Sequence, residues 1–279
     1  MRIWFQKHTV AGRNPWLDRS YERHARDLGP GTVIDFHTLP AEVYPARLPA
    51  ELVRFGQLEV FFSWYFAERA IEAERAGYDA YVIGTSQDPG LAAARTLVSI
   101  PVLGYGQVAF EFLRSQGLRF GVIGFVPALE EILRGNLAGY GCADLCVGFR
   151  YLPQGRNVVE QGAPADAVAA LRPRMEAAAA SLAEAGAQAI VPGEGIPNEM
   201  FCGNGIRSFA GLPFLDANAL VLATAQMQAR TRELGVWHRD VPGYHTERAP
   251  VAEVERLRAI FAPAVTRRSP AAPNTKEAP

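Results

Sequence analysis

Two segments of the chain, residues 77–86 (GYDAYVIGTS) and 186–195 (GAQAIVPGEG), match each other without a gap. Each begins with a glycine suited to the end of a helix, continues as a short apolar strand and ends in a glycine followed by a polar residue. A helical pattern follows each copy, and then a Pro-led apolar strand, PVL from residue 101 and PFL from residue 213. The sequence therefore predicts two similar units related by duplication.

Apolar strands alternate with helical patterns along most of the chain, which predicts an α/β protein whose parallel sheets are covered on both faces. The segments RIWF from residue 2 and RFGVIG from residue 119 would open the two units. We expect residues 1–112 with 216–266 to form the first domain and residues 113–215 to form the second. Residues 267–279 are rich in Pro and Ala, and we expect a disordered tail there.

The repeat makes Thr85 and Glu194 matching residues at two strand ends. Ligands of open parallel sheets bind beyond the carboxyl ends of the strands. A pseudo-two-fold axis between the units would place both side chains on opposite sides of one small ligand, in a cleft between the domains. This arrangement suits proton removal from one face and delivery to the other. It equally suits anion binding on one side and acid–base catalysis on the other.

Glu194 is the candidate acid or base. A free glutamate ionises near pKa 4.3, and burial in an apolar cleft raises that pKa by up to several units, toward the range of a useful acid–base group. The alternative is a structural carboxylate that caps the following turn or pairs with an arginine. Gly193 and Gly195 flank it and leave it little shielding, which favours the functional interpretation.

Thr85 and Ser86 are candidate anion-binding donors. An alcohol is too weak an acid to act as a free base at neutral pH, whereas hydroxyls and backbone N–H groups at a helix start bind anions well. Thr85 would then hold a carboxylate, imide or carbonyl, and the alternative is plain helix capping. Asp88 before Pro89 predicts a structural cap of the following helix.

Four further residues follow strands at the same predicted edge. Gln6 and His8 come after the first strand, and His8 is either an acid or hydrogen-bond donor to substrate or a surface histidine. Gln107 follows the fourth strand and Asn198 follows Glu194, so both are candidate amide contacts to substrate. Asn198 alternatively closes a turn after Pro197.

Composition excludes several classes of function. The net charge of −1 gives no basic excess for nucleic acid, and no apolar run reaches the length of a membrane helix. The opening MRIWFQKHTV lacks a secretory signal, and three cysteines fit a reducing cytoplasm better than a disulfide framework. The GYGQVA at residues 104–109 fits a dinucleotide fingerprint only superficially, because no acidic residue follows at the required strand end. CADLC at 142–146 lacks further metal ligands, so we expect neither a cofactor nor a metal.

The stretch GYDAYVIGTSQDPGLAAARTLVSIPVLGYG resembles the first half-site of the aspartate/glutamate/hydantoin racemase superfamily, most closely its hydantoin racemase branch. GAQAIVPGEG with GLPFLDANALVLATA resembles the second half-site. The resemblance implies two facing Rossmann-like (flavodoxin-like) domains, no cofactor, and two cysteines on either side of the substrate's acidic carbon. In this chain Thr85 and Glu194 replace those cysteines. The GTS at residues 84–86 is closer to the arylmalonate decarboxylase and maleate isomerase branches, in which hydroxyls and amides hold a carboxylate.

The sequence thus predicts a cofactor-independent racemase or isomerase that acts next to a carbonyl of a small acid or hydantoin-like cyclic amide. Glu194 would move the proton, and Thr85 and Ser86 would bind the anionic or carbonyl group. A lyase, decarboxylase or hydrolase on the same frame is the first alternative, and a non-catalytic small-ligand binding protein is the second. The resemblance further implies a homo-oligomer that binds a small molecule, and the composition argues against nucleic acid and membrane as partners.

Overall fold

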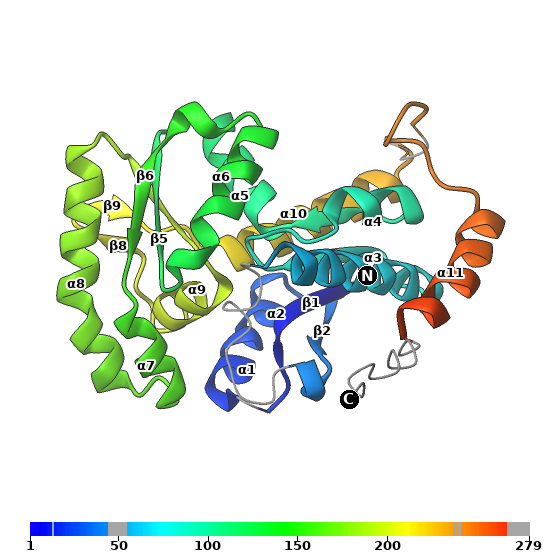
Figure 1. Cartoon of the computed structure of the whole chain (residues 1–279). Helices are drawn as coiled ribbons and strands as arrows, with labels where there is room; N and C mark the ends of the chain where they lie inside the picture. Colours follow the sequence, from blue (N-terminus) through cyan, green and yellow to red (C-terminus); the bar gives the residue numbers. More distant parts are fainter. Residues whose placement is uncertain (13, 44–54, 237, 239–240, 267–279) are drawn as a thin grey trace, which may run out of the picture.

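The computed structural model describes residues 1–12, 14–43, 55–236, 238 and 241–266 of the 279-residue chain. The tail predicted to be disordered lies outside these residues. Two parallel sheets lie in two lobes (Figure 1). The first sheet has the order β2-β1-β3-β4 and the second the order β6-β5-β7. The parallel strands are β1 (Arg2–Val10), β2 (Val33–Leu39), β3 (Ala80–Gly84), β4 (Val102–Gly104), β5 (Phe120–Gly124), β6 (Cys146–Tyr151) and β7 (Ala189–Pro192).

The strand order of the first sheet repeats in the second. In each sheet the opening strand of the unit lies between the second and third strands of that unit. Phe214 continues the match, because it forms a parallel bridge with Ile190 where β4 would pair with β3. These two Rossmann-like parallel sheets confirm the predicted fold class.

The Pro-led strand predicted from residue 213 is largely wrong. Instead β8 (Ser208–Phe209) and β9 (Leu212–Pro213) form a short antiparallel hairpin, and Phe214 alone bridges to the parallel sheet. The proline has no backbone N–H to donate to a ladder, which helps to keep this segment from extending as a full strand.

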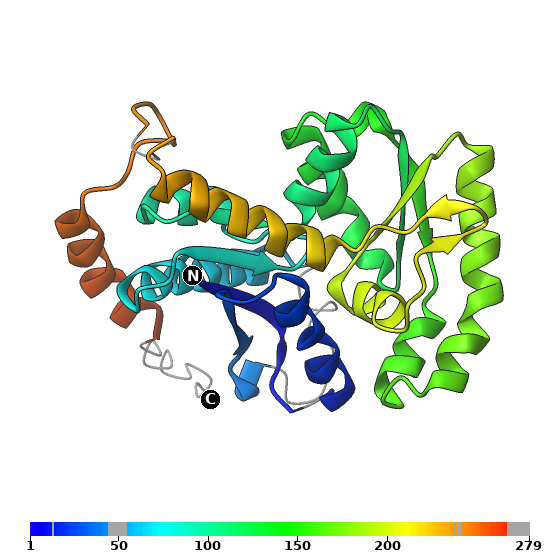
Figure 2. The ribbon, with the colours of Figure 1, turned by 180° about the vertical axis from the view of Figure 1, so that it is seen from behind.

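Helices cover both faces of the first sheet because its strand residues alternate in direction. Tyr81 and Ile83 pack in the cluster that contains α3 (Gly56–Arg75) and α4 (Leu91–Leu97). Ala80 and Val82 pack with α1 (Pro15–Tyr21) and with the long return helix α10 (Ala217–Glu233), which lies along the sheet in Figure 2. A short helix, α2 (Arg23–Asp27), follows α1.

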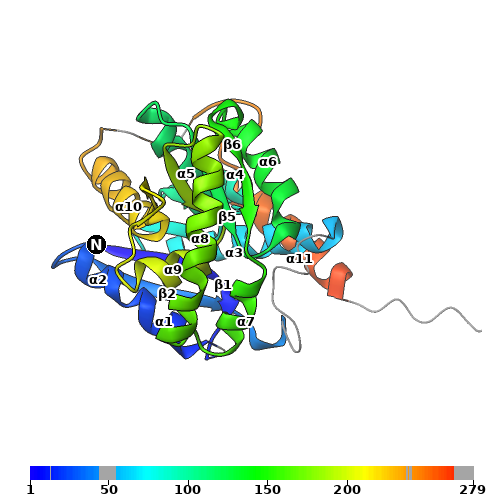
Figure 3. The ribbon, with the colours of Figure 1, turned by 90° about the vertical axis from the view of Figure 1, so that its left-hand side faces the viewer.

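The second sheet is covered by α8 (Ala165–Glu184), which lies on the outer side of the lobe (Figure 3). Its buried face includes Leu171, Met175 and Leu182. The other helices of this lobe are α6 (Glu130–Gly139), α7 (Gln154–Glu160) and α9 (Gly195–Cys202). Short 3₁₀ helices span Ala41–Val43, Pro127–Leu129 and Ala143–Leu145.

The chain passes from the first sheet to the second through α5 (Tyr105–Ser115) and returns to the first through α10. The predicted domain boundary at residues 112/113 falls inside α5, where Phe110 stacks on Phe120 of β5 at 5.6 Å between ring centroids. A last helix, α11 (Val251–Thr266), joins α3 through an ion pair of Arg258 with Glu68. Within the described ranges, none of the helices combines the length and apolar character that a membrane crossing requires.

Candidate active site

A small cavity of about 80 Å³ lies where the carboxyl ends of the two sheets meet. Thr85 follows β3 of the first sheet, Glu194 follows β7 of the second, and both line this cavity. The structure therefore brings the two matched positions of the repeat to one pocket. The other residues that line it are Lys7, His8, Thr9, Tyr21, Gly84, Gln87, Phe125, Val126, Leu129, Arg156, Val159, Gly195, Ile196 and Pro197.

The carboxylate of Glu194 is held by the backbone at the end of β5. The N–H of Phe125 donates to both oxygens at 3.1 and 3.0 Å, and the N–H of Val126 donates to Oε1 at 2.9 Å. Glu194 also occupies the N-cap position of α9, but its side chain makes no capping hydrogen bond to that helix. The predicted alternative of a cap for the following turn is therefore wrong.

Burial raises the pKa of Glu194 to about 7, against the lowering effect of the hydrogen bonds from Phe125 and Val126. A carboxyl group with a pKa near neutrality accepts and releases protons at physiological pH with little driving force lost in either direction. The site therefore holds one group suited to general acid–base chemistry.

Thr85 is 6% exposed, and its hydroxyl donates to the side-chain oxygen of Gln87, which also lines the pocket. The hydroxyl is thus oriented by a neighbour. A substrate oxygen would have to compete with Gln87 for the hydroxyl proton, while the hydroxyl oxygen remains an acceptor.

Ser86 does not line the pocket. Its side chain is 1% exposed, and its hydroxyl donates to the carbonyl of Gly193 at 2.5 Å, which joins the end of β3 to the end of β7. Tyr105 makes a parallel link, because its hydroxyl donates to the carbonyls of Pro192 at 3.2 Å and Glu194 at 3.3 Å. The structure thus gives Ser86 a role in joining the lobes rather than a direct contact with the cavity.

Of the two candidates on β1, His8 lines the pocket and Gln6 does not. The ring of His8 packs against Phe62 and Phe66, and burial lowers its pKa to about 4, so it is neutral at pH 7. Gln6 is fully buried, accepts a hydrogen bond from Trp4 Nε1 at 3.1 Å and donates to the carbonyl of Lys7 at 3.2 Å. Both the oxygen and the nitrogen of the Gln6 amide therefore have hydrogen-bond partners inside the protein.

Gln107 lies away from the pocket, and its neighbourhood explains the GYGQVA pattern. The buried carboxylate of Asp88 accepts hydrogen bonds from the backbone N–H groups of Gly106 at 3.0 Å and Gln107 at 2.7 Å. A Cβ on Gly104 or Gly106 would come within 2.9 Å of that carboxylate. The glycines therefore admit an internal carboxylate rather than a nucleotide phosphate. Asp88 therefore caps α5. The sequence predicted that it caps the helix directly after it, and this prediction is wrong.

Asn198 of α9 also lies outside the pocket lining, in a buried polar network. Its amide donates to Glu199 at 3.2 Å and Asp216 at 3.0 Å, and its oxygen accepts from the N–H of Ala217 at 2.7 Å. Asn198 therefore fixes the start of α10.

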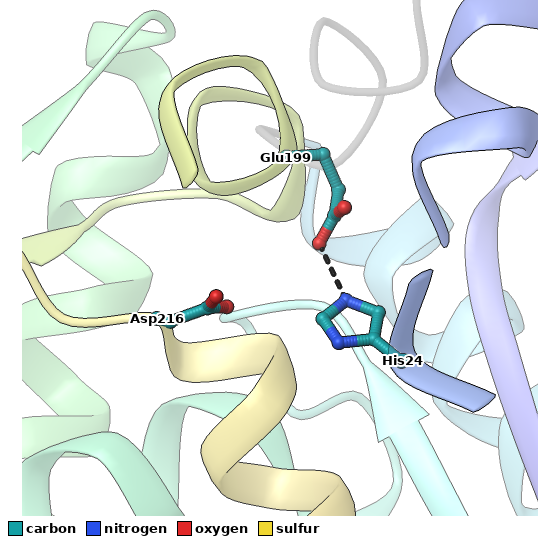
Figure 4. Close-up of side chains that lie close together, drawn as sticks. All are labelled: His24, Glu199 and Asp216. Atoms are coloured by element: carbon teal, nitrogen blue, oxygen red, sulfur yellow. Dashed lines mark hydrogen bonds and ion pairs between the residues drawn. The ribbon is translucent and has the colours of Figure 1, made fainter. Parts of the chain in front are cut away.

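The same network contains the three residues of Figure 4, which bring potential metal ligands within 4.8 Å of one another. His24 from α2 lies 2.8 Å from Glu199, and the carboxylate of Asp216 is nearby. The guanidinium of Arg23 pairs with Asp216 at 2.7 Å and with Glu199 at 3.2 Å. Because this guanidinium already pairs with both carboxylates, the cluster is an ion-pair network that joins the lobes.

Sequence reasoning missed Lys7, Tyr21, Gln87 and Arg156, all of which line the pocket. Tyr21 reaches the pocket because Gly195 has no side chain. A Cβ on Gly195 would lie 2.9 Å from the tyrosine hydroxyl. The strand pattern offered a signal for Lys7, which pairs in register with Gly84, the residue before Thr85. Tyr21 and Arg156 lie on helices, and the sequence carries no comparable signal for them.

Comparison with known proteins agrees with this geometry. A model of the family described as Asp/Glu/hydantoin racemase matches residues 19–193, more than half of the chain. The chain belongs to this family. A hydantoin racemase of Rhizobium meliloti is 35% identical over 122 residues, which cover 44% of this chain and 49% of the relative. A hydantoin racemase of Paenarthrobacter aurescens is 28% identical over 162 residues, 58% of this chain and 66% of the relative. The chain thus spans about half the length of the first of these relatives.

Solved structures of racemases share the fold. An allantoin racemase from Pseudomonas fluorescens aligns over 90% of this chain and 98% of its own, with 19% identity and a TM-score of 0.62. A glutamate racemase from Bacillus anthracis aligns over 94% of each chain, with 16% identity and a TM-score of 0.55. At these identities the likeness establishes the two-sheet architecture.

The cysteines of this family member lie away from the pocket. Cys142, Cys146 and Cys202 all belong to the described part of the chain, and none of them lines the cavity. Burial raises the pKa of each thiol. A pair of thiols therefore does not act across this pocket.

Proposed function

We propose that the protein moves a proton at the carbon next to a carbonyl of a small acid or hydantoin-like cyclic amide, without a cofactor. Glu194 is the acid–base group, and Thr85 donates a hydrogen bond to the carbonyl or anionic oxygen. The reaction would be a racemisation or related isomerisation, in line with the names of the relatives. The observation that carries the proposal is the carboxyl of Glu194, whose pKa is raised to about 7, in one cavity with Thr85.

In this mechanism the ionised Glu194 removes the proton, and negative charge develops on the carbonyl oxygen of the substrate. A hydrogen bond from Thr85 to that oxygen stabilises the enolate, once the hydroxyl proton turns from Gln87 to the substrate. The amides of Phe125 and Val126 hold the glutamate at the end of a rigid strand, which limits the loss of entropy on reaching the reactive geometry.

A lyase or decarboxylase is the second candidate, because the Thr85 side of the pocket lacks a matching acid–base group. Thr85 is an alcohol, and His8 is neutral with a pKa of about 4. Inversion at carbon needs proton transfer on both faces, whereas decarboxylation needs one protonation of the enolate. Glu194 alone suffices for the second reaction.

One assay separates these possibilities. The protein is incubated in D₂O with 5-substituted hydantoins, amino acids and substituted malonates, and NMR follows the α-protons and products. Deuterium at the α-carbon that depends on Glu194 supports the isomerase, and loss of carbon dioxide or another new product supports the lyase. Binding without either result would contradict catalysis and favour a ligand-binding protein. Light scattering of the same sample tests the expected homo-oligomer.

A further inference from the structure

Lys7 is an unusual residue for this chain. The sequence contains 28 lysines and arginines, and Lys7 and Lys276 are its two lysines. Lys276 lies outside the described residues, whereas Lys7 lies on β1 beside the residue that precedes Thr85. Its side chain is 5% exposed and lines the same cavity as Thr85 and Glu194. A buried lysine at a pocket, in a chain that otherwise uses arginine, indicates a specific task.

The ammonium of Lys7 is held from two sides. It donates to the carboxylate of Asp18 at 2.5 Å and lies 5.2 Å from the ring centre of Tyr21 and 6.0 Å from that of Phe36. The aromatic faces attract the cation, and the carboxylate of Asp18 pairs with it. These contacts favour an electrostatic role for Lys7 over a covalent one.

The ammonium of Lys7 has more hydrogen-bond donors than Asp18 accepts. An ammonium carries three N–H donors, and the hydrogen bond to Asp18 takes one of them. Lysine presents a compact point charge, whereas the planar fork of arginine needs more room. A cavity of about 80 Å³ can accept one oxygen-bearing group beside such a charge.

The lining of the pocket contains more basic than acidic side chains. Arg156 from α7 contributes a second cation. His8 and Tyr21 are neutral at pH 7, because burial lowers the pKa of the imidazole and raises that of the phenol. Glu194 is the one acidic residue in the lining, and its charge depends on pH near neutrality. An anionic ligand in the pocket would therefore lie close to the cationic side chain of Lys7, whose ammonium has donors beyond the one that Asp18 accepts.

We propose that Lys7, positioned by Asp18, binds a carboxylate of the substrate, so that the preferred substrates are small carboxylic acids rather than uncharged cyclic amides. This inference rests on the proposed function for the location of the site and narrows its substrate class. A plain structural ion pair between β1 and α1 is the competing interpretation.

The scarcity of lysine makes a direct test possible. Protein that carries lysine labelled with ¹³C at Cε gives two lysine NMR signals, and Lys7→Arg assigns them. Acetate, malonate and glutamate are titrated against their neutral amides, in Glu194→Gln protein so that turnover does not interfere. At least one carboxylate should shift the Lys7 signal saturably, while its amide and the Lys276 signal show no change. The absence of a Lys7 shift with every carboxylate, or an equal shift with an amide, overturns the proposal.

Variants measure the size of the effect. Calorimetry should show that Lys7→Met weakens the Kd of the best carboxylate by ~10- to 100-fold, the usual range for a lost hydrogen bond to a charged group. Arg172→Met removes an exposed cation on α8 and should leave this Kd unchanged. Unchanged binding in Lys7→Met contradicts the proposal, and the NMR titration decides the matter if that variant does not fold. The two proposals can fail separately. If carboxylates bind at Lys7 but the wild type shows no deuterium exchange, only the proposed catalysis is refuted. If exchange occurs but no carboxylate binds at Lys7, only the role of Lys7 is refuted.

Discussion

The Oε1 atom of Glu194 accepts a 2.9 Å hydrogen bond from the backbone N–H of Val126, which ties the end of β7 to the end of β5. The candidate base is therefore positioned by main-chain atoms of its own sheet and not by a flexible side chain. Any substitution that keeps an acceptor at this place preserves the geometry and changes only the acid–base chemistry.

Replacement of Glu194 by glutamine should abolish catalysis while preserving the fold. The glutamine oxygen can still accept the N–H of Val126, but the side chain can no longer take up a proton. We expect proton exchange, followed by NMR in D₂O, to fall by ~10²- to 10⁴-fold. The control is Glu184→Gln, which changes an exposed glutamate of α8 and should exchange at the wild-type rate. Full activity in Glu194→Gln would exclude Glu194 as the base.

The pH dependence of the reaction distinguishes a base from an acid. If ionised Glu194 removes the proton, kcat/KM rises with pH and levels off above the pKa of about 7. If the protonated carboxyl delivers the proton, as in a decarboxylase, kcat/KM instead falls as pH rises through the same value. A profile that is flat between pH 5 and 9 would contradict both roles of Glu194.

Folding stability should decrease as pH rises toward neutrality. Burial raises the pKa of both Glu194 and Asp88 to about 7, so the folded state binds these protons more tightly than the unfolded state. The stabilising contribution is complete below about pH 4 and is lost as pH rises through 7. Urea denaturation at several pH values across this range measures how the free energy of unfolding depends on pH. This dependence should have a smaller slope in Asp88→Asn than in the wild type. The exposed control Asp166→Asn should keep the wild-type slope, and an identical slope in Asp88→Asn would contradict the assignment.

The hydrogen bond from Ser86 to Gly193 should stabilise the junction of the two sheets. Ser86→Ala leaves the carbonyl of Gly193 without this donor in a buried place, and we expect a loss of ~1–3 kcal/mol in the free energy of unfolding. Ser115→Ala is a matched control, because its hydroxyl also donates to a backbone carbonyl, that of Phe112, but at the exposed end of α5. Equal effects of the two variants on urea denaturation would show that the junction gains nothing from Ser86.

Arg23 should be among the most sensitive positions outside the pocket. Arg23→Met leaves Glu199 and Asp216 without the cation between them, and the loss of one partner of a buried charge network typically costs ~3–5 kcal/mol. Arg230→Met breaks an exposed pair with Glu233 and should cost less than ~1 kcal/mol. Thermal unfolding compares the two, and a small effect of Arg23→Met would mean that water or a bound ion replaces the guanidinium.

The repeat in the sequence was sufficient to predict two similar units with parallel sheets and the meeting of Thr85 with Glu194. Both follow from local patterns, because residues at the carboxyl ends of matching parallel strands must lie at matching places. His8 was predicted at the pocket for the same reason, but its neutrality was not. That property comes from packing against Phe62 and Phe66, which lie far away in the sequence.

Residues whose partners lie across the junction could not be assigned from local patterns. Ser86 and Asn198 resemble ligand-binding residues in the sequence, yet both bond to groups about a hundred and about twenty residues away, respectively. Asp88 precedes one helix but caps another, because the fold brings Gly106 to its carboxylate. Lys7 was passed over in favour of its neighbours, since the direction of its side chain depends on Asp18 and Tyr21.

The two crossings of the chain, outward through α5 and back into α10, determine how the lobes can move. A lobe attached by a single linker can swivel freely, but one attached by two neighbouring segments is limited to bending about the line that joins them. Opening and closing of the cavity should therefore be a hinge motion about one axis. A covalent cross-link on the side opposite these segments would lock the protein shut with the ligand inside.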